Sequence, residues 1–448
     1  MKGMHYTRES YIQKQVAYFK SHARPESKLL GLELEHFLLD AQTLRSYGYH
    51  EPDGQHDLLR KLLAFGWSIQ LEEDGFLLGI EKDGSTITLE PGGQVELSLK
   101  PLSSLKEIDE VYREILLDLS KGMKPNQILA GIGYHPVTKI DELPLLPKKR
   151  YGMMYEYFKI NGRYCHNMMK GTAATQVSID YYSEEDFIKK FRVANYLSPI
   201  LASLFDATPF FEGQLTQGRN MRARIWAETD VKRSKLIPHS MDNAFGFADY
   251  ANYLLSLPPI LIYTDGELVF SNEQTLESAI KEYAFDDAEL EHHTSMVFPD
   301  VRLKKYIEIR MPDALPYPYN IAVAGLIKAI FYNSEVLNKY YVKSLEVNDQ
   351  WVQAQNEALK QTEKSCCAIA YGVHVNVGET ADIMALKSEL LDDAIHVLGE
   401  DERTYIEKVK ALISEEGSFT TYLQKLYMHD LENFIETIKV IGGESHDL

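Results

Sequence analysis

Cysteine is scarce in this sequence: the only three are Cys165, Cys366 and Cys367. Adjacent cysteines rarely bridge each other, and three are too few for a disulfide framework or a zinc site. We therefore expect free thiols in a reducing, cytoplasmic environment, with Cys366 and Cys367 buried in a helix rather than active in redox chemistry.

Long hydrophobic runs are also missing. The two most apolar stretches, "YNIAVAGLIKAIFY" and "YLLSLPPILIY", are interrupted by Lys328 and by Pro258 and Pro259, respectively. Neither reaches the ~20 residues needed to cross a bilayer. The first 22 residues contain no apolar segment of the kind found in signal peptides. We expect a cytoplasmic protein with no membrane partner.

Positive charge is in deficit, because 47 Lys and Arg face 66 Asp and Glu and leave a net charge of −19. An acidic surface is repelled by phosphate backbones, so we expect no nucleic-acid partner. The familiar nucleotide motifs are absent as well: no Walker A loop occurs, and "GIGYHP" at 131–136 lacks the third glycine of a dinucleotide fingerprint. A bound nucleotide would need another kind of site.

No internal repeat, low-complexity tract or long linker divides the 448 residues. The first three quarters mix strand and helix patterns, whereas the remainder is mostly helical. This favours an α+β fold in one domain over residues 1–448, with a core over about 28–340 and a mostly helical C-terminal section over about 341–448.

Several predicted strands place polar side chains on one face and aliphatic side chains on the other. In "GLELEHFLLD" Glu33 and Glu35 share a face, because residues two apart in a strand point the same way. The same alternation, read in "LEPGGQVELS", "TQVSID", "NMRARIW" and "YIEIR", gives this further set: Glu90, Glu96, Gln176, Ser178, Asp180, Arg222, Arg224, Trp226, Glu308 and Arg310.

An antiparallel sheet with one solvated face shows such alternation by default, and that is the simpler interpretation of any single strand. Repeated glutamates with a few arginines favour a site instead, because close carboxylates repel unless a cation neutralises them. Oxygen ligands suit Mg²⁺ or Mn²⁺ and not zinc. Carboxylates, Mg²⁺ and inward-facing arginines are the components of a phosphoryl-transfer site that uses ATP.

Several long motifs resemble the plant and proteobacterial branch of the glutamate–cysteine ligases, in the right order from about residue 28 to 340. They are "GLELEHFLL", "LEPGGQVELSLKPLSSL", "MMKGTAATQVSIDYYSEEDFIKKFRVANYLSPILASLFDATPFFEG", "MRARIWAETDVKRS", "FGFADYANYLLSLP" and "VRLKKYIEIRMPDALP". The resemblance implies a curved antiparallel sheet that forms a funnel, of the glutamine-synthetase and guanido-kinase type, with helices on its outer face. Two positions depart from the family pattern, Lys100 and Ser178.

The resemblance implies ATP-dependent joining of the glutamate γ-carboxylate to the cysteine amine through a γ-glutamyl phosphate, the first step of glutathione-type thiol synthesis. The metal ligands would be Glu33, Glu35, Glu90, Glu96 and Glu308. Arg310 would act on the transferring phosphoryl group, which a guanidinium can bind with two hydrogen bonds.

Four residues are candidates for binding the amino acids: Gln176, Ser178, Arg222 and Arg233. Arg222 would clamp a carboxylate. Arg233 would form an ion pair with Asp230 that shapes the acceptor pocket, with an ordinary surface salt bridge as the alternative. The expected partners are therefore glutamate, cysteine and ATP, with the protein a monomer or a weak homodimer.

Three other functions stay open from the sequence. Lys100 and Ser178 leave room for a related ligase that joins a different amine or acid in a tailoring pathway. A phosphagen kinase would share the sheet type but needs a reactive cysteine and more arginines. A non-catalytic metal- or amino-acid-binding protein is disfavoured by the complete set of glutamates.

Overall fold

The structure is a computed structural model that describes residues 4–264, 266–272, 275–360 and 381–443. Cys366 and Cys367 lie outside the described residues, so the expectation of a buried helical pair stays a prediction. Cys165 is buried and free, as expected.

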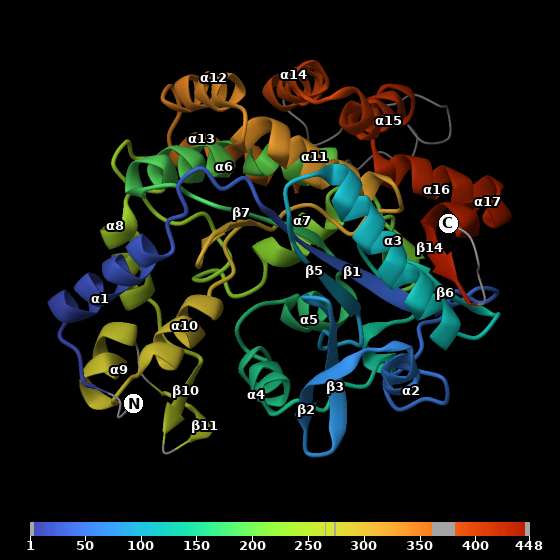
Figure 1. The fold of residues 1–448 in the computed structure, drawn as a ribbon, viewed down its shortest axis with the longest axis horizontal. Coiled ribbons are helices and arrows are strands. Elements are labelled where there is room, and N and C mark those ends of the chain that lie inside the picture. Colours follow the sequence, from blue (N-terminus) through green and yellow to red (C-terminus); the bar gives the residue numbers. More distant parts are fainter. Residues whose placement is uncertain (1–3, 265, 273–274, 361–380, 444–448) are drawn as a thin grey trace.

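A large antiparallel sheet organises the chain (Figure 1). Its main path runs β12-β13-β7-β1-β5-β4-β3-β2, and β6 pairs with both β1 and β14. The strands are β1 Leu30–Asp40, β2 Ser68–Glu73, β3 Phe76–Lys82, β4 Ser85–Leu89, β5 Val95–Leu102, β6 Gln127–Ala130, β7 Thr175–Ile179, β12 Val301–Leu303, β13 Ile307–Ile309 and β14 Lys439–Gly442. Two small hairpins are separate: β8 Phe210–Phe211 with β9 Gln214–Leu215, and β10 Leu261–Thr264 with β11 Glu267–Phe270.

Helices make up most of the rest of the described chain. They are α1 Arg8–Ser21, α2 Gln55–Leu62, α3 Leu105–Gly122, α4 Lys149–Tyr157, α5 Cys165–Gly171, α6 Glu184–Leu204, α7 Met221–Ala227, α8 Phe247–Ser256, α9 Leu276–Glu282, α10 Asp287–Ser295, α11 Tyr319–Phe331, α12 Ser334–Ser344, α13 Asp349–Leu359, α14 Ala381–Val397, α15 Glu400–Glu416, α16 Phe419–His429 and α17 Leu431–Ile438, with short 3-10 turns at Leu63–Phe65 and Ile140–Glu142.

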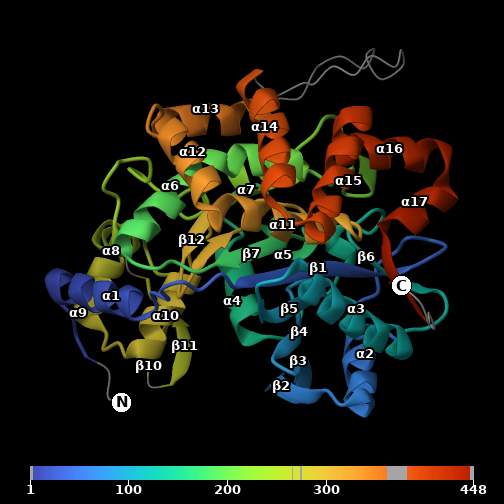
Figure 2. The same cartoon turned by 45° about the horizontal axis from the view of Figure 1, so that its top comes forward.

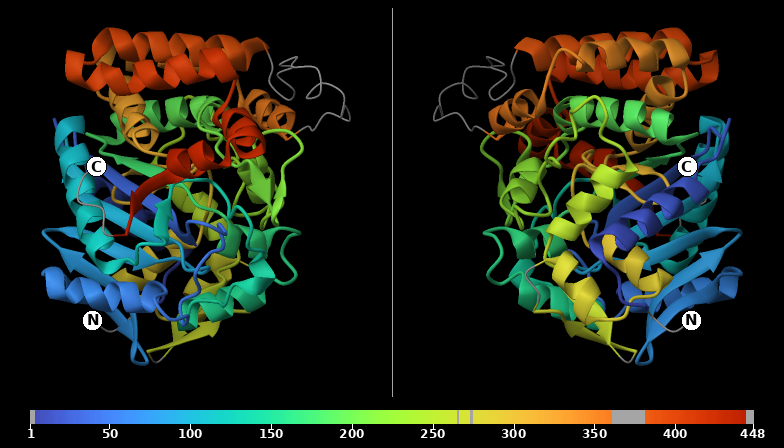
Figure 3. Two further views of the ribbon diagram at one scale, coloured as in Figure 1. Left: turned by 90° about the vertical axis from the view of Figure 1, so that its right-hand side faces the viewer. Right: turned by 90° about the vertical axis from the view of Figure 1, so that its left-hand side faces the viewer.

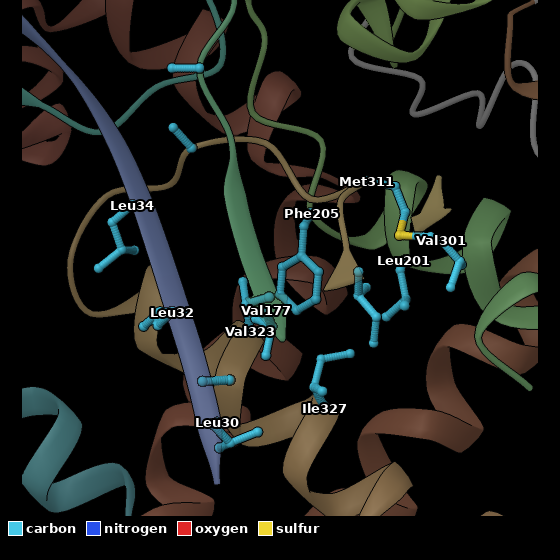
Figure 4. Packing of buried hydrophobic residues seen from close by; sticks show 14 of the residues in the cluster. Leu30, Leu32, Leu34, Val177, Leu201, Phe205, Val301, Met311, Val323 and Ile327 are labelled. Carbon is cyan, nitrogen blue, oxygen red and sulfur yellow. The ribbon is translucent and has the colours of Figure 1, made fainter. Parts of the chain in front are cut away.

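The central strand β1 shows why the sheet has two unlike faces. Leu30, Leu32 and Leu34 are at most 2% exposed, whereas the residues between them are only partly buried. Val177 of β7 lies directly beside Leu32, so the apolar faces of the two strands are continuous. Figure 4 shows this face packing against side chains of α6 and α11, including Phe205 just after α6 and Ile327.

The helices are distributed unequally over the two faces of the sheet. Figures 1 and 2 show α6, α11 and α12 to α15 on one side of β1 and β7, and α4, α10 and the β10–β11 hairpin on the other. Figure 3 shows the C-terminal helices, in orange and red, as the outermost layer of the first side. α11 packs on β1 and β7, and α14 and α15 pack on α11, so the C-terminal section covers the helices that cover the apolar face.

One expectation about an element is wrong. "NMRARIW" was expected as a strand and forms helix α7, because Met221 and Ile225 are buried four residues apart, which is helical spacing. Farther along the chain, α11 and α12 are separated by a break at Tyr332 and Asn333, and the Asn333 side chain caps α12.

The α+β class and the large antiparallel sheet are confirmed, whereas the funnel is not. Among the described residues the end strands β12 and β2 do not pair with each other, so the sheet is open. No described helix combines the length and the apolar character that a bilayer crossing requires.

Because Leu32 packs beneath the polar face, we predict that truncating its side chain strongly destabilises the protein. Leu32→Ala is expected to lower the free energy of unfolding by about 2–5 kcal/mol, since it leaves a cavity between the sheet and its helices. Leu431→Ala is the control, because Leu431 is 47% exposed, and should change stability by about 0.5 kcal/mol or less. Denaturant unfolding of both variants measures this, and equal losses would contradict the packing described here.

Candidate active site

Strand register gathers most of the predicted polar residues on one face of the sheet. Glu33 of β1 lies between Ser98 of β5 and Gln176 of β7, and Glu35 lies directly opposite Glu96. Like charges directly opposite each other on neighbouring strands are destabilising. The face therefore holds a carboxylate pair that ordinary strand pairing would avoid.

A chain of hydrogen bonds crosses this face from β1 to β13. The Glu35 carboxylate accepts from the backbone N–H of Ala174 at 2.9 Å and from Gln176 Nε2 at 3.0 Å. Gln176 Oε1 in turn accepts from Arg310 Nη1 at 2.6 Å, and the same nitrogen donates to Glu308 at 3.0 Å. The structure thus brings together Glu35, Gln176, Glu308 and Arg310, as the sequence predicted.

Glu308 is fully buried and surrounded by cations, which the sequence interpretation did not foresee. Arg302 Nε donates to it at 2.6 Å and Lys304 Nζ at 3.0 Å, in addition to Arg310. Burial alone would raise the pKa of this carboxyl, but the three cations outweigh burial and hold the pKa well below its usual range. A metal ion could reach Glu308 only by displacing one of these partners.

The alternation in "YIEIR" does not reveal Arg302 and Lys304, because both residues precede it. Arg302 lies in strand "VRL", which has the same alternation, and pairs directly with Glu308 across the β12–β13 ladder. Pairing "VRL" with "IEI" through the intervening turn would have placed Arg302 beside Glu308.

The other four glutamates are less well compensated, because nearby cations, such as Lys148 for Glu90, do not outweigh burial. Burial, together with Glu96 and Glu308, raises the pKa of Glu33 to about 7, and burial with Glu90 raises that of Glu96 to about 7. Burial and the carboxylates of Glu90 and Glu96 raise the pKa of Glu35 well above its ordinary value. Negative charge on this part of the face exceeds what the protein's own cations neutralise.

Glu90 lies just beyond β4, in the loop "EPGGQ" that leads to β5. The loop is closed by a hydrogen bond from Glu90 N–H to the Gln94 carbonyl, and Gly93 adopts the left-handed φ of +84° that favours glycine. Tyr151 of α4 donates its hydroxyl to Glu90 at 3.3 Å, and burial raises the Glu90 pKa. Helix α4 therefore faces the carboxylates, a contact that the sequence did not indicate.

Within the described part of the chain, no three His, Cys, Asp or Glu side chains are already arranged to hold a metal ion. The donor chemistry nevertheless fits one. Four oxygen-bearing side chains with raised pKa values repel one another, and a hard divalent cation would relieve that repulsion. The residues that fit are Glu33, Glu35, Glu90 and Glu96.

Arg222 lies in helix α7 and not on the sheet. Its guanidinium donates to the carbonyls of Met311 at 3.1 Å and Arg310 at 3.2 Å, and it lies 3.7 Å from Asp313. Trp226, one helical turn later, shares its face of α7, whereas Arg224 does not. The helix thus holds Arg222 against the end of β13, next to Arg310.

Arg233 is buried rather than exposed. It donates to Asp230 at 2.6 Å and to the Tyr157 hydroxyl at 2.9 Å, and it also donates to the Pro258 carbonyl. The predicted ion pair is therefore present, and the alternative of a surface salt bridge is wrong, because both side chains are at most 4% exposed. These three partners hold the Arg233 side chain in the protein interior.

Ser178 lies on the polar face between Gly31 and Glu308, as expected from its strand position. Gly31 leaves room there, since a Cβ at that position would come within 3.3 Å of the Ser178 Cβ. Lys100 follows Glu96 and Ser98 on alternate positions of β5 and so shares their face.

A cavity of about 260 Å³ opens beside Arg310. Its wall includes Arg222 and Trp226 of α7, Ser234, Asp300 and Asn356 of α13. The cavity therefore lies between Arg310 at the end of β13, helix α7 and helix α13 of the C-terminal section.

Comparison with known proteins gives consistent matches. Residues 29–426 match the model of glutamate-cysteine ligase family 2 (GCS2). The chloroplastic glutamate–cysteine ligase of Brassica juncea is 32% identical over 364 residues, which cover 79% of this chain and 68% of that protein. Chloroplastic glutamate–cysteine ligase A of Oryza sativa subsp. japonica is 31% identical over 356 residues, which cover 77% and 71%.

Among solved structures, a glutamate–cysteine ligase from Francisella tularensis in complex with AMP aligns with 92% of this chain and 87% of its own. Its sequence identity to this chain is 13% and the TM-score is 0.49.

The expected cytoplasmic location is wrong by these comparisons, because the plant relatives are chloroplastic enzymes. The low cysteine content indicated only a reducing environment, which does not distinguish one reducing compartment from another. The match over residues 29–426 and the relatives at 31–32% identity show that the chain belongs to glutamate-cysteine ligase family 2, which confirms the family and the ligase activity that the motifs predict.

Proposed function

We propose that the protein joins the glutamate γ-carboxylate to the cysteine amine with consumption of ATP, in one ligase domain over residues 1–448 that works as a monomer or weak homodimer. The core over about 28–340 would carry the chemistry, and the sheet would curve around the substrates as a funnel. One observation carries the proposal: four buried carboxyls with raised pKa values lie on the polar face and in its adjoining loop, and one of them, Glu35, is linked through Gln176 to Arg310.

Glu33, Glu35, Glu90 and Glu96 are proposed to hold Mg²⁺ or Mn²⁺. Such ions, when bound, screen the phosphates of ATP from the attacking carboxylate. Glu308 is proposed as a metal ligand only once Lys304 or an arginine moves away, because its oxygens already accept from three cations. In the arrangement described, Glu308 orients Arg310.

Arg310 is proposed to stabilise the charge that develops on the transferring phosphoryl group. Gln176 and Glu308 both accept from its Nη1, so these two contacts fix the orientation of the guanidinium plane. A donor that is already oriented needs no reorganisation when the charge appears. Attack of the γ-carboxylate on the γ-phosphorus releases ADP, and attack of the cysteine amine on the acyl phosphate releases phosphate.

The amino acids are proposed to contact Gln176, Ser178 and Arg222. Gln176 and Ser178 lie on the polar face, and Arg222 lines the adjoining cavity. Arg233 is proposed to act indirectly, because its hydrogen bonds to Asp230 and Tyr157 fix the segment that leads to Ser234. A ligase for a different amine is the second candidate, since Lys100 adds a positive charge to the same face.

The activity itself is tested by incubating the full chain with ATP, Mg²⁺, glutamate and a panel of amines. ADP release that requires both glutamate and cysteine is expected. Release with glutamate and another amine, but not cysteine, would favour the second candidate. Tight metal binding without any ADP release would show that the protein is not a ligase.

Metal binding is predicted to depend on pH, because it requires ionised carboxylates. Glu33 and Glu96, with pKa values of about 7 above the ordinary 4.5, stay largely protonated at pH 6 in the metal-free protein. Between these pH values the folded protein binds more protons than the unfolded chain. The free energy of unfolding of the metal-free protein should therefore fall as pH rises from about 4.5 through 7. Mg²⁺ should therefore raise Tm more at pH 8 than at pH 6.

Glu33→Gln should reduce the Tm increase caused by Mg²⁺ at pH 8 and should lose most turnover. Glu81→Gln is the matched control, since Glu81 is exposed on β3, and should keep both. Equal Mg²⁺ effects in the two variants, or full activity in excess chelator, would contradict the metal assignment.

Arg310→Lys retains the positive charge but loses the planar guanidinium. We expect kcat to fall by the equivalent of about 2–4 kcal/mol with a smaller change in KM, because the contact acts in the transition state. Arg224→Lys is the control on α7 and should stay within about twofold of the parent enzyme. A change confined to KM would rule out the proposed role of Arg310.

A further inference from the structure

The 260 Å³ cavity contains an unusual group of unsatisfied polar atoms. Among the described residues, Trp226 Nε1, Ser234 Oγ and Arg222 Nε are buried and have no hydrogen-bond partner. All three side chains belong to the cavity wall. Arg222 and Ser234 are 5% and 9% exposed, so bulk solvent barely reaches them, and Trp226 is partly buried.

Unsatisfied buried donors are costly, at about 1–3 kcal/mol each, and native proteins contain few of them. Three in the wall of one cavity therefore need an explanation. Two of the three are obligate donors, because an indole N–H and a guanidinium N–H cannot accept a hydrogen bond. A ligand that satisfies them must offer acceptor oxygens.

The charged side chains around the cavity restrict which charged groups a bound ligand can carry. The indole ring of Trp226 lies 5.9 Å from the guanidinium of Arg222 and 5.8 Å from that of Arg310, so the donors are surrounded by two positive charges. Lys235 and Lys360 add positive charge to the same wall, and Asp300 and Glu357 supply carboxylates. An α-amino acid, with a carboxylate and an ammonium group, matches both signs.

We infer that Trp226 and Ser234 are substrate-binding residues that donate hydrogen bonds to the carboxylate of an amino-acid substrate held in this cavity. The inference rests on the proposed function and extends it to two residues that the motifs did not assign. The cavity volume is close to the lower end of the ~300–1,000 Å³ typical of small-molecule sites, which suits a substrate of this size.

Substitution of Trp226 distinguishes a substrate-binding role from a purely structural one. Trp226→Phe keeps an aromatic ring between the two arginines and removes an N–H that has no partner in the free protein. The unliganded variant should therefore lose little thermal stability, while its affinity for glutamate or for cysteine falls roughly 10-fold or more, the range for a hydrogen bond to a charged group.

Trp67→Phe is the matched control. Trp67 is more deeply buried than Trp226, and its Nε1 donates to Asp118 at 3.1 Å. It precedes β2, at the end of the sheet opposite β12 and β13. This variant should lose Tm and keep the parent affinity for both amino acids. For the hydroxyl, Ser234→Ala should weaken binding, whereas Ser240→Ala should not, because Ser240 has an equally unsatisfied Oγ outside the cavity wall.

Calorimetric titration of each full-length variant with glutamate and with cysteine, together with steady-state KM and kcat, performs the test. A higher dissociation constant for one amino acid in both Trp226→Phe and Ser234→Ala supports the inference and identifies which substrate occupies the cavity. Unchanged dissociation constants for both amino acids, or a change only toward ATP, would overturn it.

The titrations also separate this inference from the proposed reaction. If the parent protein binds an amino acid through Trp226 and Ser234 but releases no ADP, the ligase proposal fails and the binding assignment stands. If the parent enzyme turns over and both variants bind as it does, only the binding assignment fails.

Discussion

The buried carboxylate of Glu308 is the interaction on which the site depends. It accepts from Arg302, Lys304 and Arg310, and Arg310 extends the network through Gln176 to Glu35. Four neighbouring strands, β12, β13, β7 and β1, are thereby joined by side chains as well as by the backbone ladder. Loss of one partner would leave an uncompensated charge in a buried position, which typically costs about 3–5 kcal/mol.

This network also separates the face into two electrostatic regions. Around Glu308 the cations are in excess, and the carboxyl pKa is held low. Around Glu33, Glu35, Glu90 and Glu96 the carboxylates are in excess, and their pKa values are raised. This division suits a phosphate-containing substrate that binds together with divalent cations. Its phosphates would lie near the cations around Glu308, and its metal ions would lie near the four carboxylates.

Packing on the apolar face of the sheet keeps the strands in register. Leu32 and Val177 pack side by side beneath the polar residues, and α6 and α11 cover them. Because a slip of one residue would move every glutamate to the wrong face, this packing maintains the site. The C-terminal helices extend the support through α14 and α15, and α13 reaches the cavity wall directly through Asn356.

Alternation within single strands was enough to predict the polar face, since side-chain direction in a strand is a local property. On that basis alone Glu33, Glu35, Gln176 and Arg310 could be placed together. The same rule failed at "NMRARIW", where seven residues fit a strand and a helix equally well, and packing of Met221 and Ile225 decided for α7. The partners of each charge depend on contacts such as Gln176 to Glu35 and Arg310 to Gln176, which join residues 141 and 134 positions apart. The sequence by itself therefore determined which residues of β1, β5, β7 and β13 share the polar face. Only the tertiary structure placed Arg222 and Arg302 and decided which charges are neutralised, because strand register and helix packing bring distant charges together.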